Sequence, residues 1–193
     1  MPEPQFAERK QVLAERMAGV AKAVTSENFA SLLDPLMREV LQQGFSAAGA
    51  HEGTLWLLDS NAQNLVPAYN TGPNSQKIVG HFRQPLTSGV ISMVLASEQP
   101  FIENEVFNNT QQSKLLDAAL QVQTYALIAV PFYFLKNCRG VVSCVQLKTP
   151  RSETHVPPGF APSALLSIQT ATTLVSRLLE YRVLSSTVDW ATD

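Results

Sequence analysis

The sequence predicts an α+β domain in which a central antiparallel sheet of about five to six strands carries helices from both ends of the chain on one face and a helix-and-loop lid on the other. Three observations predict this fold class. Two apolar, strand-like runs, 125–134 and 140–147, are separated by only five residues and therefore form a hairpin. A long helical pattern follows them at 162–186. A short apolar helix, 88–97, comes directly before a strand-like stretch that starts at Phe101.

Composition limits the classes of protein to which the chain can belong. It has 193 residues, of which 45% are hydrophobic and 16% charged, which is enough for one domain with a substantial core. We expect an N-terminal helix in 1–25, a single domain over 26–186 and a short tail at 187–193. The net charge of −2 and the lack of a Lys/Arg cluster argue against a nucleic-acid or membrane partner. The start has no signal-peptide pattern, and the longest apolar run, 126–135, is too short to cross a bilayer. We therefore expect a soluble cytoplasmic protein.

The first half of the chain reads as helices followed by strands. Good helix formers fill 6–23, and an apolar stripe at helical spacing follows from Phe29 to Phe45. Asp34 and Pro35 suit the N-cap and first turn of the main helix there. Strands are predicted at 53–58 and 64–69, closed by turn residues, and a third at 78–84. Ser88 then begins the short helix, which is apolar on almost every side and should therefore be buried.

The second half contains a long loop and the last helix. The stretch 103–124 holds one short helical candidate, 113–120, and connections this long inside a compact domain are often functional. The helix at 162–186 carries two apolar stripes. The broad one should pack on the sheet. The thin one, with Leu166, Leu174, Tyr181 and Leu184, should contact either a second chain or the first helix of the same chain.

Few residues suggest metal or nucleophile chemistry. The two cysteines, Cys138 and Cys144, are about 20 Å apart if they lie on one strand, so they cannot pair there. They are most simply reduced thiols, and three scattered histidines give no metal-ligand spacing. No nucleophile elbow or phosphate-binding Gly loop is present. We expect no catalytic residue, metal or cofactor.

Four segments, 50–59, 86–104, 125–148 and the last helix, together resemble a GAF domain over about 29–184. The resemblance implies a GAF/PAS-like architecture in which the apolar helix, the next strand and the long loop close over the sheet and form a small-molecule pocket. It places ten residues at that pocket: Thr54, Trp56, His81, Val90, Ile91, Phe101, Asp117, Thr124, Tyr125 and Cys144.

The ligand classes of GAF domains fit these residues unequally. Covalent bilin attachment needs a lid thiol, and 104–124 has no Cys; haem would depend on His81 alone. The resemblance to cyclic-nucleotide-binding domains is closer, because Thr54 keeps a hydroxyl group and the helix start at Val90 can bind an anion. However, these domains share a signature of an Asn-Lys pair followed by Phe and then Asp-Glu, and only its Lys and Phe are matched here, by Lys148 and Phe160.

Three functions remain open. The first is a non-catalytic regulatory module that senses an unknown small molecule, couples binding to its terminal helices by population shift and forms a homodimer through them. The second is a ligand-free interaction scaffold whose cavity is filled by Met93, Leu95, Phe101, Phe107 and Leu127. The third, a thiol-dependent enzyme similar to free methionine sulfoxide reductase, has its thiols in the wrong places. The volume of the cavity separates the first function from the second: a pocket of several hundred Å³ favours binding, and a solid interior favours a scaffold.

Overall fold

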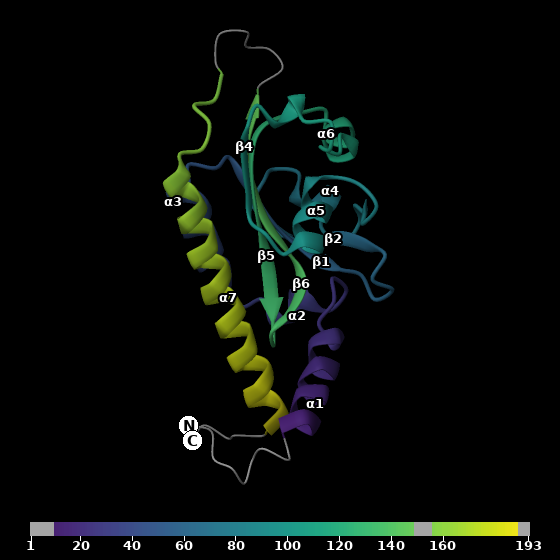
Figure 1. Ribbon diagram of the computed structural model, residues 1–193. Coiled ribbons are helices and arrows are strands. Elements are labelled where there is room, and N and C mark those ends of the chain that lie inside the picture. The colour runs from purple at the N-terminus through teal and green to yellow at the C-terminus, as the bar shows by residue number, and fades with distance from the viewer. Residues whose placement is uncertain (1–9, 149–155, 189–193) are drawn as a thin grey trace.

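A computed structural model describes residues 10–148 and 156–188. Its centre is a six-stranded antiparallel sheet with the strand order β3-β2-β1-β6-β5-β4. The strands are β1 Glu52–Leu58, β2 Asn64–Asn70, β3 Gln84–Pro85, β4 Phe101–Asn104, β5 Gln123–Phe134 and β6 Asn137–Lys148. The long β5–β6 hairpin lies in the middle, and helices cover both faces (Figure 1). The α+β antiparallel fold class predicted from the sequence is confirmed.

One face of the sheet is covered by α2 Phe29–Leu32, α3 Pro35–Ala47 and α7 Pro162–Val188. Asp34 caps α3 as predicted, because its carboxylate accepts a hydrogen bond of 2.9 Å from the Met37 N–H. Gly44 lets α3 approach α7 closely, since a Cβ atom there would lie 2.5 Å from the Ala171 Cβ. Apolar side chains of the three helices and the sheet make up the larger of two cores, which we call the helix-side core.

The other face carries the lid, which we define as residues 86–122. It contains α5 Val90–Ser97, β4, the 3-10 turn η2 Val106–Asn108 and α6 Leu115–Leu120. A short helix, α4 Ser75–Ile78, lies beside it (Figure 1). A smaller lid-side core, which includes Trp56, Val90 and Val94, joins the lid to the sheet.

Two local predictions are wrong. The strand expected at 78–84 is the end of α4, then a turn and only a two-residue strand, β3. Gly80 has a φ of 75°, a left-handed conformation that breaks an extended chain there. The helix expected to be buried all round, α5, buries Val90, Ser92 and Val94 but leaves Ala96 and Ser97 exposed. The part of the sheet that α5 covers is too small to bury all of its apolar side chains.

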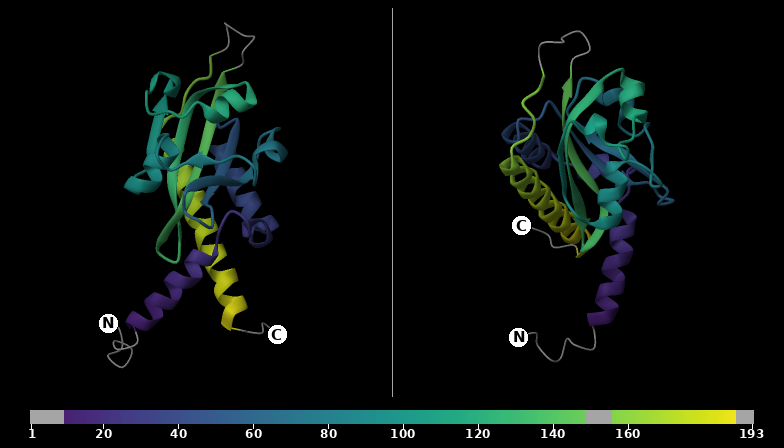
Figure 2. Two further views of the ribbon diagram at one scale, coloured as in Figure 1. Left: turned by 90° about the vertical axis from the view of Figure 1, so that its right-hand side faces the viewer. Right: turned by 45° about the horizontal axis from the view of Figure 1, so that its top comes forward.

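The first described helix, α1 Lys10–Ala23, leaves the domain instead of covering it. Among the α1 side chains that the structure describes, only Ala21, near the end of the helix, is buried, and Val24 follows in the helix-side core. In Figure 2 α1 and α7 diverge below the sheet. The thin stripe of α7 is therefore not covered by α1: Leu166 and Tyr181 are each 66% exposed. The start of the helix predicted at 6–23, and the tail after 188, lie outside the described residues.

Among the described residues, no helix is long and apolar enough to span a bilayer.

Candidate functional site

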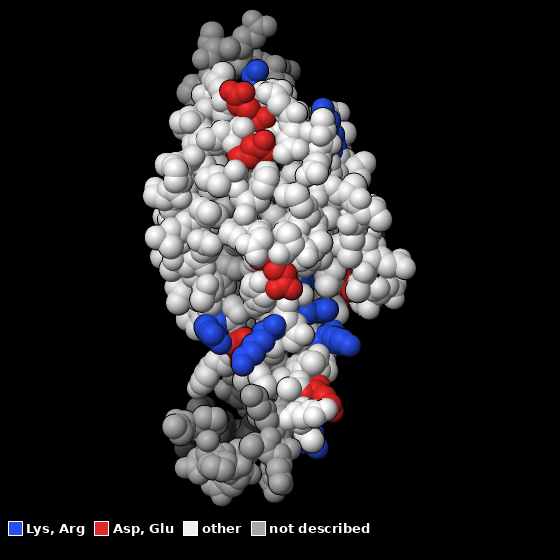
Figure 3. Space-filling view, in the orientation of Figure 1, with Lys and Arg blue, Asp and Glu red and all other residues white. Residues whose placement is uncertain are grey.

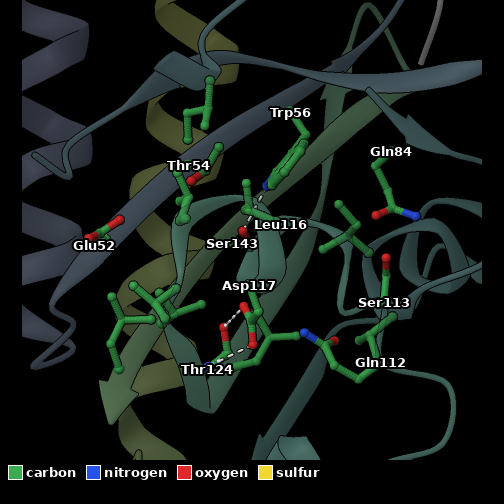
Figure 4. A pocket seen from close by; sticks show the side chains of 18 of the residues that line it. Glu52, Thr54, Trp56, Gln84, Gln112, Ser113, Leu116, Asp117, Thr124 and Ser143 are labelled. Atoms are coloured by element: carbon green, nitrogen blue, oxygen red, sulfur yellow. Dashed lines mark hydrogen bonds between the residues drawn. The ribbon is translucent and has the colours of Figure 1, made fainter. Parts of the chain in front are cut away.

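A cavity of about 70 Å³ lies between the sheet and the lid. Strands β1, β5 and β6 form its floor, and α5, α6 and the turn before α6 form its roof (Figure 4). It is lined by Glu52, Thr54, Trp56, Asn70, Ile78, Gln84, Val90, Ile91, Gln112, Ser113, Leu116, Asp117, Leu120, Val122, Thr124, Leu127, Ser143, Val145 and Leu147.

Strand alternation places the floor residues. Glu52, Thr54 and Trp56 are two residues apart on β1 and face the lid, while the residues between them face the other side. β6 lies beside β1 with Thr54 opposite Ser143. The Ser143 hydroxyl accepts a 2.9 Å hydrogen bond from the Trp56 indole N–H, and both side chains are buried. This bond fixes the indole ring as one wall of the cavity.

A second polar group is held by β2. The Asn70 side-chain amide donates a 2.9 Å hydrogen bond to the Thr54 hydroxyl, and its carbonyl accepts one of 2.8 Å from the Gly72 N–H. The Thr54 hydroxyl keeps its own proton available, because the one hydrogen bond that it makes to a described residue is accepted from the Asn70 amide. It can therefore donate a hydrogen bond to a guest in the cavity.

Hydrogen bonds also fix the roof. The Asp117 carboxylate accepts hydrogen bonds of 2.9 Å and 2.7 Å from the Thr124 N–H and hydroxyl, which tie α6 to the start of strand β5 (Figure 4). The Gln84 side chain is 2% exposed and donates a 2.8 Å bond to the Ser88 carbonyl, which holds the start of α5. None of the described side chains caps α5, whose first residues, Val90 and Ile91, line the cavity.

The Glu52 side chain has no hydrogen bond or ion pair with any described residue, and among the polar side chains that line the cavity it shares this only with the neutral Gln112. It is half-buried, and its carboxylate packs over Gly72. Burial raises the pKa of this carboxyl group above its usual value. In Figure 4 it lies at one edge of the group of lining residues.

The structure brings six of the ten predicted pocket residues to the cavity: Thr54, Trp56, Val90, Ile91, Asp117 and Thr124. The other four lie elsewhere. His81 is exposed in the turn after α4, where the third strand was expected. Phe101 packs at the edge of the lid-side core. Tyr125 packs against the helix-side core and the Phe107 ring, with ring centres 5.9 Å apart. Cys144 faces the helix-side core, because alternation turns it away from the lid.

Sequence reasoning missed several lining residues. Glu52 could have been found by strand alternation, since it is two residues before Thr54 on the same face. Ser143 follows only from the pairing of β6 with β1, which the sequence does not state. Asn70, Gln84 and Gln112 lie in turns or at strand ends and had no detectable pattern.

Neither thiol belongs to the cavity. Cys144 is 1% exposed, and burial raises its pKa to about 12. Cys138 lies near the tip of the β5–β6 hairpin, where burial raises its pKa to about 11. Across 10–148 and 156–188, no three His, Cys, Asp or Glu side chains gather as metal ligands would.

Solved structures resemble this arrangement of sheet, lid and helices. The GAF domain of a phosphoenolpyruvate-protein phosphotransferase from Coxiella burnetii superposes with a TM-score of 0.59 at 17% identity, covering 86% of this chain and 99% of that one. The GAF-B domain of DevS from Mycobacterium smegmatis gives a TM-score of 0.52 at 16% identity and covers 82% and 100%. The chain has a GAF fold.

The GAF-fold structures that resemble this chain also include an enzyme. Free methionine-R-sulfoxide reductase from Neisseria meningitidis, solved with its substrate, gives a TM-score of 0.58 at 16% identity and covers 85% of this chain and 91% of that one. No family model and no curated protein matches the sequence. Solved structures that resemble this chain therefore include both GAF domains and a reductase.

Proposed function

We propose that the chain is a non-catalytic regulatory GAF module that binds a small molecule in the cavity under the lid and works in the cytoplasm. The observation that carries this proposal is the lining of the cavity. Thr54, Gln84 and Thr124 are buried and held by hydrogen bonds, yet they border empty space instead of packed side chains. Fixed polar groups around an apolar cavity are typical of ligand sites. Reduced thiols suit the cytoplasm.

The volume of the cavity limits the guest. Drug-sized ligands occupy sites of about 300–1,000 Å³, whereas this cavity has about 70 Å³. It is therefore smaller than the pocket that the sensing function was expected to need, but it is not the solid interior that a scaffold was expected to have. Of the five residues that the scaffold hypothesis expected to fill the cavity, only Leu127 lines it. Met93, Leu95 and Phe101 pack against the lid-side core, and Phe107 packs against the Tyr125 ring. The closed form therefore suits a small guest, and a cyclic nucleotide would require the lid to move.

A chain of hydrogen bonds supports coupling between the lid and the last helix. Glu98 follows α5, and its carboxylate accepts a 2.8 Å bond from the Tyr133 hydroxyl on β5. The Tyr133 carbonyl in turn accepts a 2.6 Å bond from Ser176 on α7. Binding that moves α5 would therefore act on α7 through one strand end.

We also propose that the exposed stripe of α7 binds a second copy of this chain. Between α3 and α7 runs a surface groove lined by small residues, among them Gly44, Ala47 and Ala171. Leu166 and Leu174 project beside it and are 66% and 49% exposed. Projecting leucines next to a groove of small residues can interlock with the same surface across a two-fold axis. In Figure 3 acidic side chains gather near the upper end of the molecule and basic side chains near the lower end, and the left side of the view between them is a broad surface without charged groups.

A reductase function is the alternative that the Neisseria meningitidis structure suggests. Such chemistry needs a thiolate beside the substrate, and neither cysteine lines the cavity. Both thiols have raised pKa values, so the thiolate is scarce at neutral pH. We expect the wild-type chain and Cys144→Ser to be equally inactive on methionine sulfoxide. Turnover by the wild type that Cys144→Ser abolishes would contradict the non-catalytic proposal.

The sensing function is tested by the fluorescence of Trp56. In a Trp190→Phe background, Trp56 is the sole tryptophan, and titration with a broad metabolite panel should change its emission for at least one compound. Asn70→Leu should weaken that response, because it removes the amide that orients Thr54. A flat response across the whole panel would favour the scaffold function.

A further inference from the structure

The lining of the cavity has an excess of negative charge. Glu52 and Asp117 are both acidic, and none of the described Lys, Arg or His residues lines the cavity. The uncapped start of α5 contributes partial positive charge, but a helix N-terminus amounts to only about half an elementary charge. Two carboxyl groups outweigh it. The cavity should therefore attract small cations and repel anions.

Of the two acidic residues, Glu52 is the one free to bind a guest. Both oxygens of Asp117 already accept hydrogen bonds from Thr124. Glu52 has no partner among the described residues, although burial withdraws it from water. A half-buried carboxylate without a partner gains most from a positively charged hydrogen-bond donor.

The floor next to Glu52 is apolar. Strand β6 lies between β1 and β5. Val145 and Leu147 of β6 therefore separate Glu52 on β1 from Thr124 on β5, and also from Asp117, which is hydrogen-bonded to Thr124. Leu116 and Leu120 of α6 also line this space. A guest must therefore combine a cationic end with a short hydrocarbon part.

We propose that the cavity binds a short aliphatic ammonium compound, with its ammonium group on the Glu52 carboxylate and its hydrocarbon chain over Val145 and Leu147. The proposal rests on the sensing function proposed above. A volume of about 70 Å³ corresponds to roughly five to seven water molecules at about 10–15 Å³ each. A compound of five or six non-hydrogen atoms, such as n-butylamine, fits this space.

Three probes of similar size and different charge test the ligand class. The Trp190→Phe protein is titrated at pH 7.5 and constant ionic strength with n-butylamine, 1-butanol and butyrate, following both Trp56 emission and the indole N–H resonance. We expect n-butylamine to bind at least tenfold more tightly than butyrate. Glu52→Gln should weaken n-butylamine binding about tenfold and leave 1-butanol binding unchanged, whereas the matched change Glu105→Gln, in the exposed loop after β4, should alter neither.

The outcomes separate the ligand class from the sensing function. If butyrate binds as tightly as n-butylamine, or if Glu52→Gln does not weaken n-butylamine binding, the ammonium proposal is wrong but the cavity still binds guests. If n-butylamine does not bind but another compound of the metabolite panel does, the ammonium proposal is wrong and the sensing function stands. If neither the probes nor the panel cause any change, both proposals fail.

Discussion

Adjacent residues on β6 show what the sequence can and cannot tell about single side chains. Ser143 faces the lid and bonds to Trp56, while its neighbour Cys144 lies in the helix-side core. The sequence-based choice of Cys144 was off by one residue, and an error of one residue exchanges the two faces of a strand. Thr54 and Trp56 were placed correctly because both lie on the same face of one strand. The correct residue on β6 depends on the pairing with β1, which is a long-range fact.

The bond between Ser143 and Trp56 can be measured as stability. Ser143→Ala leaves the buried indole N–H without a partner, and we expect a loss of about 1–3 kcal/mol in the free energy of unfolding. Thr172→Val is the matched control, because the Thr172 hydroxyl is buried and has no hydrogen-bond partner among the described residues. Its removal should be neutral or stabilising. Urea denaturation of both variants measures the free energy of unfolding. An equal loss in the two variants would show that the effect of Ser143→Ala does not come from its hydrogen bond to Trp56.

Glu52 should make the stability depend on pH. Its pKa is higher in the folded than in the unfolded chain, because burial disfavours the charged form. Below the pKa that Glu52 has in the unfolded chain, its carboxyl group is protonated in both states and does not change the free energy of unfolding. As the pH rises through the pKa that Glu52 has in the folded chain, ionisation of the half-buried group lowers the free energy of unfolding. We expect Glu52→Gln to raise the Tm at pH 7, with a smaller gain at pH 4. The exposed Glu15→Gln on α1 should show no such difference, and a Tm gain for Glu52→Gln that does not depend on pH would contradict this explanation.

At the scale of elements, local pattern predicted most helices and strands. Asp34 and Pro35 located the start of α3, and the apolar runs located β5 and β6 within a few residues. The strand prediction at 78–84 was wrong because the apolar residues there make different contacts. Ile78 ends α4 and lines the cavity, while Phe82 packs on Trp56 with ring centres 6.1 Å apart. Short segments of this kind are positioned by tertiary contacts, which local propensity does not describe.

The close approach of α3 and α7 gives a prediction about packing. In Gly44→Ala the new methyl group meets the Ala171 Cβ, and neither side chain can rotate away. Overpacking of about 1–3 kcal/mol should exceed the gain of about 1 kcal/mol that Ala brings to a helix, so we expect a net loss of stability. Gly19→Ala in α1 meets no atom within 4 Å and should be stabilising. Thermal unfolding of the pair measures the difference, and a stabilised Gly44→Ala would contradict the observed spacing.

At the scale of the whole molecule, the thin stripe of α7 predicts self-association. We expect the wild type to sediment as a dimer at micromolar concentration and Leu166→Glu/Leu174→Glu to sediment as a monomer, because the charges would be buried without partners. Leu115→Glu, at an equally exposed leucine on α6, should remain dimeric. A wild type that sediments as a monomer at this concentration would contradict the proposed dimer through α7.

The two cores differ in size, and this affects how the cavity is reached. The helix-side core joins the sheet to the long helix α7, whereas the lid depends on the smaller cluster and on the short helices α5 and α6. Segments with few buried contacts open locally at a lower free energy than the whole domain unfolds. We expect the lid to detach transiently while the hairpin and α7 remain folded. The cavity volume would then limit which guests can be retained, and the fluctuations of the lid would decide how quickly they enter and leave.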